Sequence, residues 1–426
     1  MRLSGHKNHR GDSIDTMPVS RTTPAQGQPT PFPPLLLIAL GLLTMAGPVA
    51  TDLYLPAFPA MAREFDVGAS TIQLTLTGFL LGMGAGQLFF GPLSDRYGRI
   101  RPLLIGSSVF VLSSVAVALA PTIELLIGAR FLQGLSAAAG VVLARAVVSD
   151  RAVGGQAARL FSIMMTISGV APALAPNVGS LVFTAGGWRA ILWTITVMAA
   201  LMLLGALWQV RESLPVERRR TGHLFGGLGE AIGHRRFVGY IVLFGASFGM
   251  LMGYISASPF IYQGVLGFSP TVFALLFGAN ALGMMACGLI SARIATHIPL
   301  RRTVTAAVSV LICTGAAFTL CAVSGAPGWT LVALVFATTC SIGFVMGNTT
   351  SLALAEVRHV SGSGSAWLGG AQFTLGAIVS PLGGLGGGHS ALPLGLVLLG
   401  CSLLAAGALF ATRDRFHPTA AAGARA

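Results

Sequence analysis

Near its N-terminus the sequence reads PPLLLIALGLLTMAGPVATDLYLPAFP (Pro33–Pro59). Its apolar run is about as long as the roughly 20 residues that a helix needs to cross the hydrocarbon core of a membrane. Asp52 interrupts the run near one end, where a charged side chain is costly unless it serves a function. The stretch therefore predicts a membrane-spanning helix and marks Asp52 as a candidate functional residue.

Composition places the whole chain in the membrane class. Of 426 residues, 54% are hydrophobic and 9% are charged, whereas about a quarter are charged in a soluble domain. We predict an all-α protein, because unpaired backbone groups are too costly in lipid and the alternation of a barrel strand is absent. The twelve predicted spans are 32–58, 72–93, 102–120, 123–145, 161–183, 188–208, 237–259, 270–292, 303–323, 328–350, 364–384 and 391–411.

The distribution of basic residues predicts the orientation. Twelve spans place both termini on one side, and with that side inside, all but three of the 26 Lys and Arg residues fall in the tails, in inward loops or at their edges. Cytoplasmic loops carry such an excess. We expect a multi-pass membrane protein with both termini in the cytoplasm. The net charge of +13 then implies no nucleic-acid partner.

The longest inward loop divides the spans six and six. We predict a disordered cytoplasmic tail (1–31), an N-terminal six-helix half (32–209), a cytoplasmic linker (210–236), a C-terminal six-helix half (237–412) and a second cytoplasmic tail (413–426). The first thirty residues lack a signal-peptide pattern, and either Met1 or Met17 serves as the start. The segment GPLSDRYGRIRPL (Gly91–Leu103) is weakly similar to GLISARIATHIPLRRTV (Gly288–Val304). This internal similarity indicates two pseudo-symmetric halves.

Glycines recur every fourth residue on the second span, at Gly78, Gly82 and Gly86. This spacing places them on one face of a helix, where the absence of side chains lets a neighbouring backbone approach closely. We therefore expect a tightly packed helix seam along this face.

Two ionisable side chains lie inside spans at a similar depth. Asp52 is near the outer end of the first span and Arg130 is about seven residues into the fourth, which runs the other way. Burying both favours pairing or a shared water-filled cavity. An aspartate that alternates between dry and wet surroundings can take up and release a proton. The alternatives are that Asp52 caps the first span in water and that Arg130 snorkels to the outer interface.

Prolines indicate where helices are loosened. Pro48 lacks an N–H and leaves the Thr44 carbonyl unpaired one turn before Asp52. Pro172 and Pro176 lie one turn apart on the fifth span, which should therefore bend. Bends at these places are useful for a gate.

Catalytic and metal-binding patterns are missing from the sequence. It has no HExxH, no Cys/His set with metal-ligand spacing, and Lys7 as its only lysine, which excludes a Walker-type phosphate loop. The five cysteines have the character of packing residues. We expect no enzyme, no cofactor and no metal, and an ion gradient as the energy source.

These motifs resemble those of the major facilitator superfamily over residues 32–412. GPLSDRYGRIRP (Gly91–Pro102) is similar to its loop signature between spans two and three. RFLQGLSAAAGVVLARAVVSD (Arg130–Asp150) and APALAPNVG (Ala171–Gly179) are similar to its span-four and antiporter motifs. Within it, TDLYLPAFP, SASPFIYQGVLGFSP and GGAQFTLGAIVSPLGG resemble the bicyclomycin and chloramphenicol/florfenicol resistance (Bcr/CflA) group of drug:proton antiporters.

The resemblance implies roles for residues at matching positions. Asp52 would be the proton-carrying carboxylate and Arg130 its coupling partner. An inner conformational latch would comprise Gly91, Asp95, Arg96, Gly98, Arg99 and Asp150, and the gating residues would be Pro48, Pro172, Pro176 and Gly179. Ala175, Ser180 and Asn177 depart from the antiporter motif, and Thr44 stands where some relatives carry a second acid, which favours a single proton carrier.

The resemblance implies the major facilitator fold and a monomeric exporter in the bacterial inner membrane, in contact with lipid. It would exchange a small, largely apolar, amphenicol- or bicyclomycin-like drug for protons. Candidate substrate-binding residues are amphipathic side chains on helices that flank the site, each with the alternative role of an interhelical hydrogen bond or interface anchor: Tyr54, Tyr254, Phe260, Tyr262, Asn280, Asn348, Gln372 and Phe373. A proton-coupled importer or a metabolite exporter on the same fold is the alternative function. A channel or receptor would need an open polar pore or a signalling domain, and neither is visible.

Overall fold

The apolar runs form helices throughout the part of the chain that the computed structural model describes, which is residues 32–152, 154–219, 232–357, 361–385 and 388–412. The predicted tails 1–31 and 413–426 and the middle of the predicted linker lie outside these residues. No strand occurs within the described ranges. The prediction of an all-α membrane protein is confirmed.

The first group of helices, which we call the N-terminal group, comprises α1 (Pro34–Thr44), α2 (Ala46–Asp52), the 3-10 turn η1 (Leu55–Ala57), α3 (Phe58–Glu64), α4 (Ala69–Tyr97), α5 (Ile100–Leu119), α6 (Ile123–Arg151) and α7 (Gly154–Gln209). A 3-10 turn, η2 (Val216–Arg218), follows.

The second, C-terminal group comprises α9 (Arg235–Pro259), the π-helical turn η3 (Phe260–Val265), α10 (Pro270–Ile294), α11 (Leu300–Ser324), α12 (Gly328–Glu356), α13 (Ser361–Val379), the 3-10 turn η5 (Ser380–Gly384) and α14 (Leu392–Ala411).

Nine of the helices in the described ranges are long and apolar enough to cross a membrane, and a tenth span results if the bent pair at the start of the chain is one crossing. α7 alone covers two predicted spans. It contains Gly187 at φ 73°, a left-handed conformation that favours glycine and separates the predicted spans 161–183 and 188–208. α13 and η5 together cover the eleventh predicted span. The number of twelve crossings stays a prediction.

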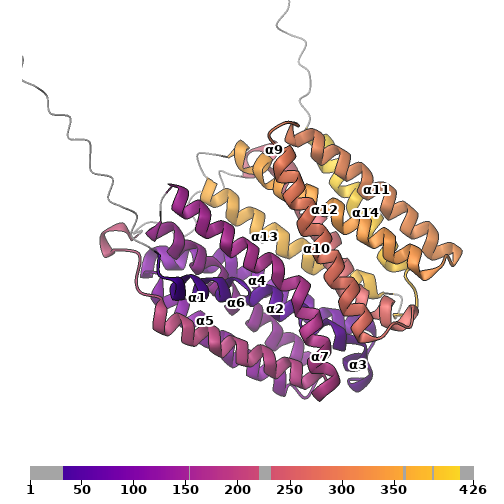
Figure 1. Ribbon diagram of the computed structural model, residues 1–426, viewed down its shortest axis with the longest axis horizontal. Coiled ribbons are helices and arrows are strands. Elements are labelled where there is room, and N and C mark those ends of the chain that lie inside the picture. The colour runs from indigo at the N-terminus through magenta and orange to yellow at the C-terminus, as the bar shows by residue number, and fades with distance from the viewer. Residues whose placement is uncertain (1–31, 153, 220–231, 358–360, 386–387, 413–426) are drawn as a thin grey trace, which may run out of the picture. The chain divides into compact units, whose positions relative to one another are not determined.

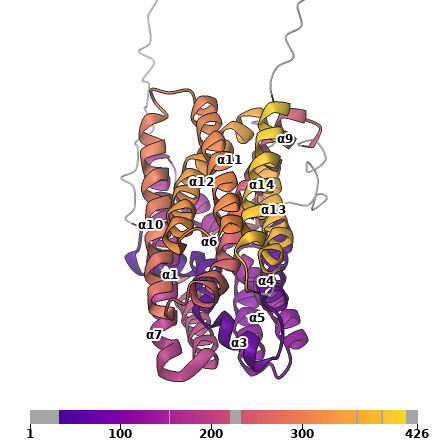
Figure 2. The same cartoon turned by 90° about the vertical axis from the view of Figure 1, so that its right-hand side faces the viewer.

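Each group packs mainly within itself. α4 and α5 lie against α6, and α1 and α5 lie against α7; in the other group α9 contacts α13 and α14, and α12 contacts α10 and α11. Figures 1 and 2 colour the groups from indigo to magenta and from orange to yellow. The groups meet where α4 contacts α13 and η5 and where α7 contacts α10. The domain boundaries predicted from the linker are not tested by these contacts.

The glycine face of α4 packs against α6, as predicted. A Cβ added at Gly78 would lie 2.9 Å from the Ile127 carbonyl oxygen, and one added at Gly82 would overlap the carbonyl oxygen of Phe131. Gly134 of α6 meets the carbonyl oxygen of Phe79 in the same way. The seam brings α6, and with it Arg130, against the wall formed by α4.

Hydrogen bonds between the two groups gather at one end of the helices. Gln73 Nε2 donates to the Ser256 carbonyl at 3.0 Å, and Gln263 Nε2 donates to the Pro56 carbonyl at 3.2 Å. Thr77 Oγ1 donates to the Ala377 carbonyl at 3.0 Å. In the predicted topology Gln73, Pro56 and Gln263 lie toward the outer side. The helix groups are therefore tied together at this end, which we call the outer end after the predicted topology.

Candidate transport site

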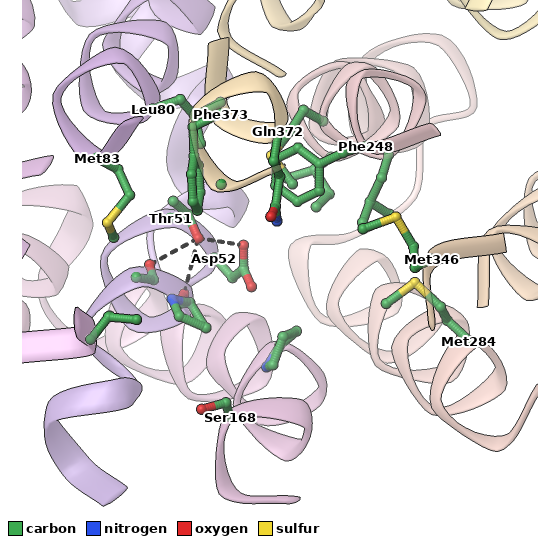
Figure 3. Close-up of a pocket in the computed structure, with 18 of the residues that line it drawn as sticks. Thr51, Asp52, Leu80, Met83, Ser168, Phe248, Met284, Met346, Gln372 and Phe373 are labelled. Carbon is green, nitrogen blue, oxygen red and sulfur yellow. Dashed lines mark hydrogen bonds between the residues drawn. The ribbon is translucent and has the colours of Figure 1, made fainter. Parts of the chain in front are cut away.

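A cavity of about 620 Å³ lies between the two helix groups, within the range of drug-binding pockets. Its wall is built from α1, α2, α4, α6 and α7 on one side and α9, α10, α12 and α13 on the other. Large apolar side chains dominate it: Phe79, Leu80, Met83, Met165, Phe244, Phe248, Met252, Phe277, Met284, Met346, Leu368 and Phe373. Methionines adapt to ligands of different shape. In Figure 3, Asp52 and Gln372 extend into the cavity from opposite groups.

Asp52 is the last residue of α2 and lines this cavity. Its side chain is buried, with 3% exposed, and its Oδ1 accepts a hydrogen bond of 2.9 Å from the Thr51 hydroxyl. The segments Pro34–Thr44 and Ala46–Glu64 meet at an angle of 42°, and the break at Met45 lies one turn before Pro48. The alternative that Asp52 caps a helix in water is wrong, because the chain continues beyond it through buried η1 and α3 residues.

Arg130 lies in the seam between α2, α4 and α6 and is 0% exposed. Nη2 donates to the Ala50 carbonyl at 2.8 Å and Nη1 donates to Gln133 Oε1 at 2.6 Å. The guanidinium carbon lies 4.4 Å from the ring centroid of Tyr54 and 4.6 Å from that of Phe79. The alternative of a snorkelling side chain is therefore wrong.

The two buried charges do not form an ion pair within the described part of the chain. Arg130 also does not line the cavity that Asp52 lines. Its donors are taken by backbone and amide oxygens, and one of these oxygens belongs to Ala50, two residues before Asp52. Arg130 thus contacts the backbone that carries Asp52. The sequence offered direct pairing or a shared cavity as alternatives, and neither is present in this conformation.

The predicted gating residues surround the same segment. Pro48 and Pro172 line the cavity. The backbone of α7 stays helical through Pro172 and Pro176, and its non-helical residue is Gly187. A Cβ added at Gly179 would overlap the carbonyl oxygen of Leu53. α7 therefore touches the backbone immediately after Asp52 at a position where only glycine fits.

Half of the predicted substrate-binding residues line the cavity: Tyr254, Asn280, Gln372 and Phe373. Asn280 Nδ2 donates to the Tyr254 hydroxyl at 2.7 Å, and the Tyr254 ring stacks on Phe277 with centroids 5.7 Å apart. Gln372 and Phe373 are neighbours on α13, and Phe373 packs against Phe248. These residues place hydrogen-bonding groups within an apolar wall.

The other four do not line it, so their placement in the cavity was wrong: Tyr54, Phe260, Tyr262 and Asn348. Tyr54 and Phe260 pack around Phe58 toward the outer ties, and Tyr262 contacts Phe268 and Phe273. Asn348 donates to Ser291 Oγ at 2.8 Å, an interhelical hydrogen bond between α12 and α10. The aromatic residues fill the closed outer end because large rings exclude water there.

Three of the predicted latch residues form an ion-pair cluster at the opposite end, namely Asp95, Arg99 and Asp150. Their role as a conformational latch stays a prediction. Arg99 Nη1 lies 2.6 Å from Asp95 Oδ1, and Arg99 Nε lies 2.9 Å from Asp150 Oδ2. Gly98 has φ 88°, a conformation that favours glycine. Arg96 is exposed and stacks on Tyr97, and a Cβ at Gly91 would meet no atom within 4 Å, so neither takes part in the ion-pair cluster.

Glu212 completes this latch and was missed from the sequence. It accepts hydrogen bonds from the backbone N–H groups of Arg99, Ile100, Ser213 and Leu214. Burial alone would raise the pKa of Glu212, but these backbone donors lower it below its usual value. Ser213 Oγ also donates to Asp150 Oδ2 at 2.7 Å. The sequence did carry a signal for Glu212. It is an acidic residue three positions after the end of α7, on the same predicted side of the membrane as the Gly91–Pro102 motif.

Arg145 was also missed as a cavity residue. It follows Val141 by one turn of α6, and both line the cavity. The sequence placed it with the orienting arginines at the inner edge of a span. Its position in the wall depends on the rotation of α6, which the glycine seam with α4 sets.

The arrangement of helices is that of solved membrane transporters. The structure is similar to that of the nucleoside transporter NupG, with a TM-score of 0.71 at 12% sequence identity over 89% of this chain and 99% of that chain. It is also similar to the xylose transporter XylE from E. coli in a partially occluded inward open conformation, with a TM-score of 0.68 at 14% identity over 88% and 96% of the two chains. At these identities the likeness concerns the fold alone.

The sequence gives the family. The model of the Major Facilitator Superfamily matches residues 40–381, and the chain belongs to that superfamily of membrane transporters. It is 38% identical to the uncharacterized MFS-type transporter YdgK of Bacillus subtilis, over 89% of this chain and 96% of that protein. It is 26% identical to a bicyclomycin resistance protein homolog of Haemophilus influenzae, over 82% and 88% of the two chains. A chloramphenicol resistance protein of Pseudomonas aeruginosa is 36% identical over 59% of each chain.

Proposed function

We propose that the protein is a proton-coupled antiporter of the bacterial inner membrane that exports a small, largely apolar drug. The observation that carries the proposal is a buried carboxylate, Asp52, in the wall of a drug-sized apolar cavity between two helix groups. The names of the bicyclomycin and chloramphenicol resistance relatives support a drug as substrate.

The geometry allows a simple exchange cycle. With the outer ends of the groups tied by Gln73, Thr77 and Gln263, a drug enters from the inner side and packs against the Phe and Met wall. A drug close to Asp52 competes with the proton for the same space. Rocking of the groups then breaks the outer ties and opens the cavity outward, where the drug leaves and a proton binds.

Everted membrane vesicles with an imposed pH gradient test this function. Addition of an amphenicol, bicyclomycin or a dye should release protons in wild type, and Asp52→Asn should abolish the release because an amide cannot carry the proton. Asp66→Asn is the matched control, since Asp66 is exposed and does not line the cavity. Proton release by Asp52→Asn equal to wild type would show that another group carries the proton.

The same vesicles decide the direction of transport. Accumulation of drug inside everted vesicles corresponds to export from the cell. Exclusion of drug together with proton movement in the same direction as substrate would instead identify an importer of the same fold.

A further inference from the structure

Two charged side chains line the cavity among the residues that the structure describes, Asp52 and Arg145. Arg130 contacts the Ala50 carbonyl and is therefore level with the turn that carries Asp52. Arg145 lies fifteen residues further along α6, which corresponds to about 22 Å at helical rise. The two charges thus stand at opposite ends of the cavity, with Asp52 toward the outer ties and Arg145 toward the inner end.

Arg145 has no partner among the described residues. No hydrogen bond, ion pair or ring contact joins its guanidinium to another described side chain or carbonyl, whereas Arg99 and Arg130 each contact several acceptors. A guanidinium presents five N–H donors in a rigid fork. Its donors are therefore available to a molecule that enters the cavity.

Arg145 is exposed and lies in the wall of a cavity that is lined largely by apolar atoms. Of the 34 described residues in the cavity wall, 14 are Phe, Met or Leu, and a low-dielectric wall focuses the field of a charge within it. When Asp52 holds a proton, its side chain is neutral. Arg145 is then the remaining charged side chain among the described residues of the cavity wall. An organic cation then meets repulsion at the inner end, while an acceptor oxygen meets unused donors.

We propose that Arg145 is a charge filter that selects uncharged or acidic apolar molecules bearing strong acceptor oxygens and excludes organic cations. This inference rests on the proposed function, because it defines the substrate class of the same cavity. Acceptor groups that fit are nitro, sulfonyl, phosphoryl and carboxylate oxygens, attached to an aromatic or aliphatic body that packs against the Phe and Met wall.

Two probes with the same aromatic body test the filter. Triphenylphosphine oxide is neutral and carries a strong acceptor oxygen, whereas methyltriphenylphosphonium is a permanent cation without an acceptor. Binding is measured by equilibrium dialysis with the full chain in detergent, against empty micelles as the blank. The Asp52→Asn background fixes the charge at the other end of the cavity.

In that background the oxide should bind about tenfold or more tightly than the phosphonium, and Arg145→Gln should bring the ratio close to one by improving phosphonium binding. Arg145→Lys should keep most of the preference for the oxide, because the positive charge remains. A retained preference also shows that the variant still folds. Arg151→Gln is the control, since Arg151 is on the same helix, does not line the cavity and donates to the Arg211 carbonyl.

An equal affinity of the two probes in the Asp52→Asn background would overturn the filter, and so would a preference that survives Arg145→Gln. Failure of both probes to bind would overturn it as well. These measurements use no gradient, so they stand apart from the proton-release assay. A transporter that fails to couple protons can still show the filter, and a coupled exporter can lack it.

Discussion

At the scale of single residues, the central feature is a buried arginine, Arg130. It donates a hydrogen bond to the backbone two residues before Asp52, the proposed proton carrier. Arg130 contacts Ala50, Thr75 and Gln133 and lies between two aromatic rings. Each contact uses the planar, delocalised shape of the guanidinium. A lysine offers a compact charge that cannot reach three acceptors in different directions.

Arg130→Lys should therefore lower drug-induced proton release about tenfold or more while the protein still inserts, because the turn that carries Asp52 loses its support. The vesicle assay measures this, with Arg63→Lys as the control at an exposed arginine. Transport by Arg130→Lys at the wild-type rate would contradict a positioning role.

Asp52 and Arg130 could be found from the sequence because a charge inside an apolar run is visible without a structure. Their separation could not be predicted. Whether a guanidinium pairs with a carboxylate or with backbone carbonyls depends on which acceptors the packed helices place around it. Arg145 was hidden for a related reason, since a basic residue near the inner end of a span looks like an orientation signal.

At the scale of elements, the close contact between α4 and α6 depends on glycines, because any larger residue would place a Cβ against the neighbouring backbone. Gly82→Ala should destabilise the protein by about 3 kcal/mol, because its Cβ would overlap the Phe131 carbonyl and the rigid α4–α6 seam would have to separate. Gly128→Ala on α6 is the matched control, since an added Cβ there meets no atom within 4 Å, and replacing a helical glycine should leave stability unchanged or raise it by up to about 1 kcal/mol.

Thermal or denaturant unfolding of the purified variants in detergent checks this prediction. A Gly82→Ala variant as stable as Gly128→Ala would mean that the seam can relax. The period of the glycines predicted this packing because a spacing of four residues defines one helix face. The breaks at Met45 and Gly187 were harder to place. Met45 lies one turn before Pro48, and Gly187 is a single residue between two apolar runs.

At the scale of the whole molecule, two sets of polar contacts lie at opposite ends. The outer ties join the two helix groups, whereas the latch of Asp95, Arg99, Asp150 and Glu212 joins elements within the N-terminal group. Three of the four misplaced cavity residues, Tyr54, Phe260 and Tyr262, fill the closed end, whereas Asn348 bonds to a neighbouring helix. Sequence can suggest which aromatic residues face the middle of the fold, but the packing of the two helix groups against each other decides whether these residues line a cavity or close it.

Glu212→Ala should weaken the latch, because four backbone N–H groups lose their acceptor. The pKa of Glu212 is lowered in the folded protein, so its contribution to stability is present above the ordinary pKa of about 4.3 and is lost as pH falls through the folded value. We expect Glu212→Ala to unfold earlier than wild type at pH 7, with a difference that shrinks below pH 4.

Denaturation midpoints at pH 7 and at low pH measure this difference. Glu217→Ala is the control, since Glu217 is an exposed acid in the same loop. A deficit of Glu212→Ala that is equal at both pH values would show that the carboxylate charge is not what holds the latch.

The closed outer end also has an electrical consequence. In the predicted topology an aqueous cavity shares the potential of the cytoplasm, so the membrane voltage falls mainly across the short layer of side chains between Asp52 and the outer surface. That layer contains Tyr54, Phe58, Phe260 and Tyr262, all buried. A proton that reaches Asp52 from outside and is released inside crosses the full voltage, worth about 2.3 kcal/mol per 100 mV. The aromatic plug thus decides at which step of the cycle the voltage acts on the proton, whereas the energy per proton is the same for any thickness of the plug.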